Sequence, residues 1–287
     1  MIEIVYLNGV LIPRNQAMIS VMDYGFLYGY SLFETMRAYE GQVFLLDRHL
    51  NRLTRSAETL GIPIEGPLLN SAVTDTIKAN KLSDARVRLT ISIGEGGITP
   101  DPTTCGNPTV LVTAGAYQPY PEQVYQHGFR AIVSAIRRNS QSPLSRLKSA
   151  NYLESLLARQ EAKKAGVDEA LLLNEKSLLT EASMSNIFLI RDGRLQTPKE
   201  ENGILPGVTR AVVLEMTSAL DIGASEQDIR LEDVFTAEEA FLTNSLMEII
   251  PLIEVDGKTV GSGRPGPVTR KLMTEYRKLV LTTMTSG

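Results

Sequence analysis

Two hydrophobic periods alternate along the N-terminal part of the chain. Residues 2–8 alternate between apolar and polar side chains and residues 10–13 return in the same way, which predicts a β-hairpin. Over residues 46–60, apolar side chains recur at spacings of three and four until Gly61, which predicts an amphipathic helix. Residues 67–80 predict a second helix.

Strict alternation resumes at residues 86–93 and predicts a strand with one apolar and one polar face. Residues 110–113 are expected to form its neighbour in the sheet. The segment 116–123 then contains two prolines and several polar residues, which indicates a linker. We therefore expect an N-terminal α/β domain over residues 1–115 and a C-terminal domain over residues 124–287.

The C-terminal domain mixes the same two periods. Residues 131–136 predict a strand, and residues 149–165 predict a helix. One face of this helix carries four apolar side chains, Tyr152, Leu153, Leu156 and Leu157. Three hairpins follow, with turns at residues 174–176, 192–193 and 256–257. The expected fold class is mixed α/β, with two domains.

Composition narrows the possible chemistry. The 287 residues include a single cysteine, Cys105, and two histidines, His49 and His127. These numbers exclude an intrachain disulfide and the usual cysteine and histidine zinc site, so we expect no metal. The sequence has neither an apolar run of about 18 residues nor a leader after Met1, so we expect a cytoplasmic protein without a membrane segment.

Charge argues against nucleic acid as a partner. The chain has 29 basic and 33 acidic residues, a net charge of −4, and they are spread along its whole length. The pairs Arg137-Arg138 and Lys163-Lys164 are too short to form a basic patch, and we interpret both as solvated faces.

Common catalytic motifs are missing, but two segments could bind an anion. The chain lacks a phosphate loop, a dinucleotide fingerprint, a hydrolase nucleophile elbow and a zinc-protease helix. Residues 204–209 lead into a predicted helix, so backbone N–H groups and the Thr209 hydroxyl lie at a helix N-terminus. Residues 243–245 cluster donors at the end of a predicted strand. Alone, the first segment is better interpreted as an ordinary helix start and the second as a turn.

Six segments, read together, resemble the class IV aminotransferases, the fold-type IV enzymes that use pyridoxal 5′-phosphate (PLP). They are residues 23–37, 46–53, 146–152, 180–188, 204–210 and 241–249. The resemblance spans nearly the whole chain. It implies two α/β domains with PLP between them, and a homodimer whose partner subunit contributes to the pocket.

The resemblance assigns three principal cofactor residues. Lys148 matches the lysine that forms the Schiff base, the internal aldimine, with PLP. Glu181 matches the carboxylate that pairs with the pyridine nitrogen and keeps it protonated, so that the ring can accept an electron pair. Arg52 matches the arginine that holds the phosphate, a task that suits a guanidinium fork.

Further residues match the surroundings of the cofactor. The remaining phosphate contacts implied are Val208, Thr209, Asn244 and Ser245. Ser183 and Asn186 match positions near the ring, with structural packing as the alternative. Tyr152 matches a tyrosine that reaches the cofactor 3′-oxygen in branched-chain aminotransferases, although its spacing from Lys148 is one residue shorter here.

Two reactions fit this resemblance. In both, Lys148 acts as the general base that removes the substrate Cα proton. A transaminase then moves the amino group between an amino acid or amine and a 2-oxo acid, and this is the interpretation we favour. An aminodeoxychorismate lyase instead releases pyruvate and p-aminobenzoate, with Thr35 as proton relay; otherwise Thr35 is a half-buried strand residue. A third alternative is a PLP-binding protein without turnover.

Substrate contacts are expected in the segment that lines the pocket in this family. The candidates are Tyr28, Phe33, Arg37 and Arg88. Either arginine could bind a substrate carboxylate in bidentate fashion. Arg88, on the alternating strand, could face either the pocket or solvent.

Overall fold

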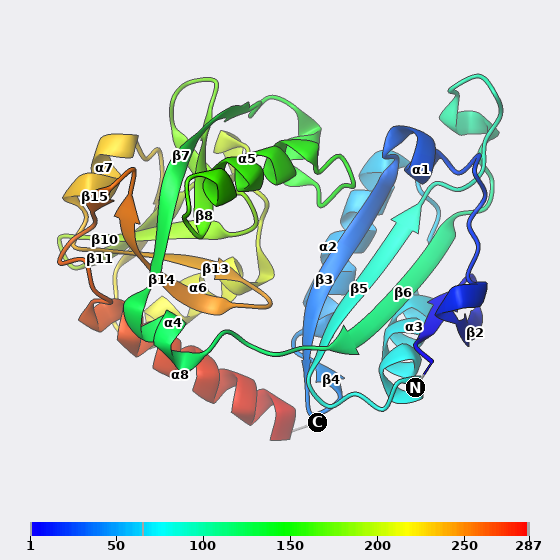
Figure 1. Cartoon of the computed structure of the whole chain (residues 1–287), viewed down its shortest axis with the longest axis horizontal. Coiled ribbons are helices and arrows are strands. Elements are labelled where there is room, and N and C mark those ends of the chain that lie inside the picture. Colours follow the sequence, from blue (N-terminus) through cyan, green and yellow to red (C-terminus); the bar gives the residue numbers. More distant parts are fainter. Residues whose placement is uncertain (1, 65, 286–287) are drawn as a thin grey trace. The chain divides into compact units, whose positions relative to one another are not determined.

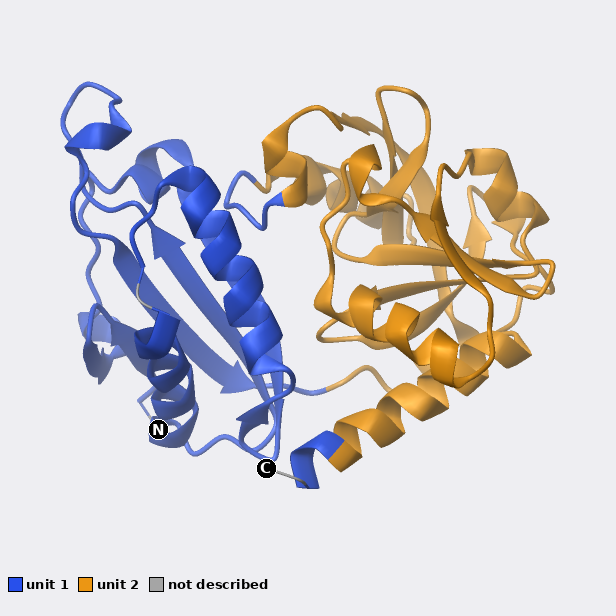
Figure 2. Cartoon of the chain, turned by 180° about the vertical axis from the view of Figure 1, so that it is seen from behind, with its two compact units in different colours: residues 1–118, 147–151, 283–287 blue, residues 119–146, 152–282 orange. Residues whose placement is uncertain are grey.

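The chain folds as a mixed α/β protein with two sheets, as predicted. A computed structural model describes residues 2–64 and 66–285 (Figure 1). Contacts divide the chain into two compact units (Figure 2). Unit 1 comprises Met1–Gln118, Leu147–Asn151 and Thr283–Gly287, and unit 2 comprises Pro119–Arg146 and Tyr152–Thr282.

Unit 1 contains an antiparallel sheet in the order β2-β1-β6-β5-β3-β4. Its strands are β1 (Ile4–Leu7), β2 (Val10–Pro13), β3 (Ser31–Tyr39), β4 (Gln42–Val43), β5 (Ala85–Ser92) and β6 (Thr109–Ala116). The hairpin predicted at the N-terminus is β1–β2, and the predicted neighbours are β5 and β6. Both pairings are therefore confirmed.

Helices cover one face of this sheet (Figures 1 and 2). The helices of unit 1 are α1 (Tyr24–Tyr28), α2 (Leu46–Leu60) and α3 (Gly66–Ala79), with short 3-10 turns η1 (Arg14–Gln16) and η2 (Pro102–Thr104). Leu32 and Met36 of β3 pack into the same core as Leu53 of α2. Because side chains alternate along a strand, Phe33 and Thr35 lie on the opposite, open face.

A short segment that follows the predicted linker returns to unit 1. The backbone N–H of Phe33 donates to the carbonyl of Lys148 at 2.9 Å, and the N–H of Ala150 donates to the carbonyl of Ser31 at 2.8 Å. An antiparallel bridge joins Leu32 to Ser149. Lys148 is therefore held against β3, an arrangement that hydrophobic periodicity did not predict.

Unit 2 contains a mixed sheet in the order β12-β11-β10-β13-β14-β7-β8-β9, with β15 paired to β14. Its strands are β7 (Phe129–Arg138), β8 (Glu169–Asn174), β9 (Leu179–Ala182), β10 (Asn186–Arg191), β11 (Arg194–Pro198), β12 (Ala224–Gln227), β13 (Glu239–Asn244), β14 (Glu248–Val255) and β15 (Lys258–Thr259). The three predicted hairpins are β8–β9, β10–β11 and β14–β15, and all three are antiparallel pairs.

The helices of unit 2 are α4 (Glu122–His127), α5 (Leu153–Lys164), α6 (Val208–Ala219), α7 (Leu231–Thr236) and α8 (Pro267–Thr285), with 3-10 turns η3 (Pro143–Arg146) and η4 (Glu200–Asn202). None of the helices in the described ranges is long and apolar enough to cross a membrane.

Helix α5 differs from the prediction in where it begins and in which side chains it buries. The helix begins at Leu153 rather than at residue 149, because residues 147–151 pair with β3. Its buried residues are the small side chains Ser155, Ala158 and Ala162, which let the helix approach β7 and β8 closely. The leucines at 153, 156 and 157 are exposed in the single chain.

Candidate active site

Lys148 lies on the open face of the unit 1 sheet beside an aromatic ring. Its Nζ is 4.9 Å from the centroid of the Phe33 ring, and the guanidinium carbon of Arg88 is 3.9 Å from the same centroid. Both distances fall in the range of cation–π contacts. Thr35 is the β-sheet partner of Arg88, so its side chain is on this face as well. Four of the predicted site residues therefore occupy one surface.

The two other predicted substrate residues of unit 1 have different neighbours. The Arg37 guanidinium is 4.2 Å from the Tyr39 ring centroid and 5.0 Å from that of Tyr117. Tyr28 ends helix α1 and is 47% exposed. The glycine that follows it accepts a hydrogen bond at 3.0 Å from the side chain of Asn151, which ties α1 to the segment that carries Lys148.

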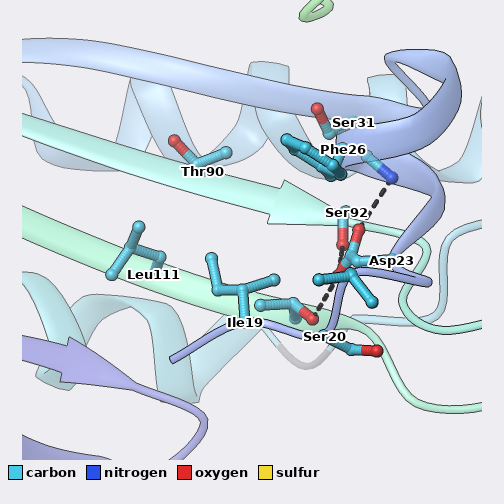
Figure 3. A pocket seen from close by; sticks show the side chains of 11 residues that line it. Ile19, Ser20, Asp23, Phe26, Ser31, Thr90, Ser92 and Leu111 are labelled. Carbon is cyan, nitrogen blue, oxygen red and sulfur yellow. Dashed lines mark hydrogen bonds between the residues drawn. The ribbon is translucent and has the colours of Figure 1, made fainter. Parts of the chain in front are cut away.

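A cavity of about 280 Å³ opens on the same unit (Figure 3). Its lining includes Ile19, Phe26, Thr90 and Leu111, together with Asp23. The Asp23 carboxylate accepts hydrogen bonds from the Gly25 backbone and from the Ser92 and Thr109 hydroxyls at 2.6–2.7 Å. These bonds satisfy the carboxylate locally, and we assign this cavity no part in the chemistry.

Arg52 faces the helix-covered side of β3, where it pairs with a buried carboxylate. Its Nε and Nη2 donate to Oε1 and Oε2 of Glu34 at 2.8 and 2.6 Å. His49 Nδ1 lies 2.8 Å from the same Oε2. Burial alone would raise the pKa of Glu34, but the charge of Arg52 and the hydrogen bond from His49 outweigh burial and lower it to about 2. The sequence drew attention to Arg52 and missed both partners.

Glu181 of β9 is a buried carboxylate with three donors. Arg138 donates to Oε1, while the Asn186 amide and the Leu205 backbone N–H donate to Oε2 at 3.2 and 3.0 Å. The interpretation of Arg138 as a solvated face is wrong, because its side chain is 14% exposed and ion-paired. The sequence did contain a signal. A strand that extends through residue 138 places Arg137 and Arg138 on opposite faces.

The segment before α6 is hydrogen-bonded to the Glu181 carboxylate through the backbone N–H of Leu205. Asn186 donates to the carbonyl of Leu205 at 2.9 Å, and a Cβ added at Gly207 would lie only 2.1 Å from Asn186 Oδ1. Gly207 therefore allows the chain to pass close to Asn186 before the helix begins at Val208. Thr209 is 3% exposed.

The end of β13 contributes a further hydroxyl near this segment. Thr243 is the β-sheet partner of Asn186, so the two side chains share a face, and its buried hydroxyl has no hydrogen-bond partner within residues 2–64 and 66–285. In contrast, Asn244 uses its side-chain amide within its own turn and toward the carbonyl of Met184. Ser245 follows in the turn and is half-buried. The sequence indicated Thr243 only as part of the donor cluster 243–245, and its place beside Asn186 makes it a site candidate of its own.

Tyr152 immediately precedes α5 and reaches β9. Its hydroxyl donates to the carbonyl of Ser183 at 3.0 Å, and the Ser183 hydroxyl donates to the buried carboxylate of Glu169. Burial and the charges of Glu181 and Glu169 raise the pKa of Tyr152 to about 12. Tyr152 therefore stays a protonated donor throughout the physiological pH range.

Comparison with known proteins supplies the context for this geometry. Residues 31–255 match the family model described as amino-transferase class IV. A protein of Methanocaldococcus jannaschii, named provisionally as a branched-chain-amino-acid aminotransferase, is 38% identical over 278 residues, which cover 96% of both chains. The aminodeoxychorismate lyase of Bacillus subtilis is 36% identical over 280 residues, covering 96% of this chain and 94% of that one.

The fold is similar to that of solved structures in the same group. The crystal structure of the Escherichia coli branched-chain amino acid aminotransferase matches with a TM-score of 0.93 at 30% identity. The match covers 98% of this chain and 95% of that one.

Proposed function

We propose that the chain, which belongs to the class IV aminotransferase family, is a transaminase. Such an enzyme moves an amino group between an amino acid or amine and a 2-oxo acid. Family membership confirms the resemblance, the fold-type IV class and the dependence on PLP that we predicted from the sequence. The choice of reaction and the roles of individual residues are our proposal.

The residues of unit 2 fit PLP. The buried Glu181 carboxylate suits the protonated ring nitrogen, and it bonds the segment that leads directly into the N-terminus of α6. A helix N-terminus suits a phosphate dianion. Thr209 and Thr243 are buried, and a bound phosphate could accept hydrogen bonds from their hydroxyls. The junction of Glu181 with this helix N-terminus is the observation that carries the proposal.

When bound, PLP supplies an electron sink for the pair released at the substrate Cα. Lys148 Nζ would take the substrate Cα proton as a general base and would then donate it, as a general acid, to the cofactor carbon that receives the amino group. Glu181, with Arg138 beside it, keeps the ring nitrogen protonated. We assign the phosphate to Arg52 and, in unit 2, to the backbone of Val208, the Thr209 hydroxyl and the turn at Asn244 and Ser245, which would hold it.

The open face of the unit 1 sheet supports a role in substrate binding. Phe33 offers an apolar surface beside Lys148 Nζ, and Arg88 is held against the same ring. We assign the substrate carboxylate to Arg88 and expect Arg37 and Tyr28 to shape the rest of the pocket. Replacement of Arg88 by alanine should raise the KM for both substrates, and an unchanged KM would contradict the assignment.

One observation favours aminodeoxychorismate lyase as the second candidate. Thr35 pairs with Arg88 on the face that carries Lys148, where its hydroxyl could relay a proton. Relatives with both activities align with most of this chain. Replacement of Thr35 by the isosteric valine distinguishes the lyase from the transaminase, because it removes the hydroxyl and keeps the shape of the side chain.

The test runs both reactions in parallel with Lys148→Ala as the blank. Holoenzyme is assayed for pyruvate release from aminodeoxychorismate and for oxo-acid-dependent deamination of a panel of L- and D-amino acids and chiral amines. Fast amino transfer without pyruvate release, unaffected by Thr35→Val, supports the transaminase. Equal amounts of pyruvate and p-aminobenzoate, lost with Thr35→Val, would make the protein a lyase, and binding of PLP without either reaction would make it non-catalytic.

We further propose that the protein is a cytoplasmic homodimer with small-molecule amino and oxo acids as its substrates. The family resemblance supports the dimer, and the location is the one that we expected from the sequence. Fractionation of the native host, followed by detection of the chain, tests the location.

A further inference from the structure

We propose that Glu34 and His49 are positioning residues that hold the Arg52 guanidinium in one orientation for the cofactor phosphate. The inference rests on the function proposed above, because it takes Arg52 as the phosphate ligand. Neither residue was singled out by the sequence, and Glu34 of β3 meets Arg52 and His49 of α2 only through the packing of α2 against β3.

The hydrogen bonds between Glu34 and Arg52 fix the plane of the guanidinium. Nε and Nη2 donate to the two carboxylate oxygens at 2.8 and 2.6 Å, which is the parallel, bidentate arrangement. A guanidinium has five N–H groups in a rigid plane. Once two of them face Glu34, the other three must point away from the carboxylate, along the opposite edge of the fork. Glu34 therefore determines where the remaining donors of Arg52 point.

His49 completes the arrangement by holding the carboxylate itself. An ionised carboxylate has only acceptors, so the contact of 2.8 Å requires His49 to donate from Nδ1. Burial lowers the pKa of His49 and, with the charges of Arg52 and Lys148, outweighs the hydrogen bond and charge of Glu34, which raise it. The neutral ring thus donates one hydrogen bond to Oε2 without adding a charge. Glu34 is 0% exposed and has no room for alternative partners from solvent.

Charge alone does not explain why a glutamate lies here. The negative charge of Glu34 offsets the positive charge of Arg52, which weakens the long-range attraction of Arg52 for a phosphate. Neighbouring inward positions of β3 are the apolar Leu32 and Met36, so a glutamate at position 34 carries a desolvation cost that an apolar residue would avoid. Orientation of Arg52 is the contribution that can offset this cost.

The glutamine variant separates orientation from charge. Glu34→Gln keeps the shape and removes the negative charge, but it places an amide N–H₂ where a carboxylate oxygen met Arg52. If charge dominated, the affinity for phosphate would rise. If orientation dominates, Arg52 turns and the affinity falls.

The measurement compares PLP with pyridoxal, which lacks the phosphate. Full-length apoprotein is titrated with each compound by absorbance, and the ratio of the two Kd values reports the contribution of the phosphate. We expect wild type to prefer PLP and Glu34→Gln to reduce this preference by about tenfold, with pyridoxal binding unchanged. A merely structural role would weaken the binding of both compounds together.

Glu239→Gln is the matched control. Glu239 is also a buried glutamate with two hydrogen bonds, but it accepts them from the backbone N–H groups of Val268 and Thr269 at the start of α8. Its replacement should lower stability and leave the PLP to pyridoxal ratio unchanged. A ratio that falls equally in both variants would overturn the proposal.

Two further outcomes distinguish failure of this inference from failure of the proposed function. Wild type without a preference for PLP would overturn the role of Arg52 and this inference together. A wild-type preference that Glu34→Gln preserves or increases would overturn only this inference. If Glu34→Gln does not fold, His49→Leu replaces it, because the buried ion pair remains. We then expect about a threefold loss of the same ratio, and an unchanged ratio would overturn the proposal.

Discussion

Arg138 and Arg137 are adjacent in sequence, yet only one of them belongs to the candidate site. Arg138 bonds Glu181, whereas Arg137 is exposed and donates to the backbone carbonyl of Ser134 at 2.7 Å. Removal of one partner from a buried ion pair costs about 3–5 kcal/mol, because it leaves the other charge uncompensated. The environment of each side chain, rather than its type, decides its role.

Replacement of Arg138 tests its proposed part in the chemistry. Arg138→Met should lower both the thermal stability and kcat, because Glu181 loses its buried positive partner and keeps uncharged donors such as Asn186 and Leu205. Arg137→Met should change the free energy of unfolding by about 0.5 kcal/mol or less. Thermal melts and steady-state kinetics on the two variants check this expectation. Equal effects of the two replacements would contradict it.

His49 makes the stability of the protein depend on pH. Because folding lowers its pKa below 6.5, the unfolded chain takes up a proton at pH values where the folded chain does not. The stability contributed by neutral His49 is therefore present above pH 6.5 and is lost as the pH falls below it. Denaturant unfolding of wild type and His49→Leu should show a difference that is constant above about pH 7.5 and shrinks toward pH 5. A difference that stays constant over this range would count against the prediction.

Among the secondary-structure elements, hydrophobic periodicity predicted the position of a strand or helix where one of its faces is buried. It located α2, α3 and β5 to within a residue and the start of β6 as closely, although β6 continues three residues beyond its predicted end; each has one face in the core of unit 1. It failed for α5, whose buried face is made of serine and alanine and carries little hydrophobic signal. The Gly-containing turns at residues 192–193 and 256–257 were predicted because short hairpins need such residues.

The candidate site was predictable only in part, for a related reason. The family resemblance identified Lys148, Glu181 and Arg52, but not the partners that hold them. Glu34 lies on an apolar strand face, so it has no local pattern that suggests function. The pairing of Lys148 with β3 depends on contacts more than a hundred residues apart in sequence. Such contacts are invisible to periodicity.

Replacement of Gly207 tests whether the protein needs the close approach of the backbone before α6 to the Asn186 side chain. Gly207→Ala should destabilise the protein by about 1–3 kcal/mol, because the new Cβ would meet Asn186 Oδ1 at 2.1 Å. The same change should weaken PLP binding, because Asn186 and Leu205 both bond Glu181. Gly115→Ala is the control, since a Cβ there meets nothing within 4 Å. Chemical denaturation and PLP titration measure both effects, and a Gly207→Ala variant as stable as the control would refute this account of the segment.

At the scale of the whole molecule, exposed apolar side chains bear on association. Phe26 of unit 1 is 76% exposed in the single chain, and Leu153 and Leu156 of unit 2 are 66% and 53% exposed. Side chains of this kind commonly become covered when copies associate. Light scattering coupled to size exclusion should give twice the chain mass of 31.5 kDa. A mass of 31.5 kDa at micromolar concentration would contradict the proposed homodimer.

The most direct test of the central claim is a single half-reaction. Purified holoenzyme is mixed with one amino acid substrate in the absence of any oxo acid, and the absorbance of the cofactor is followed together with the oxo acid produced. The account predicts conversion of the cofactor to its amine form with one oxo acid released per chain, reversal on addition of an oxo acid, and no change with Lys148→Ala. A cofactor that stays in its aldehyde form while pyruvate is released from aminodeoxychorismate would contradict the transaminase.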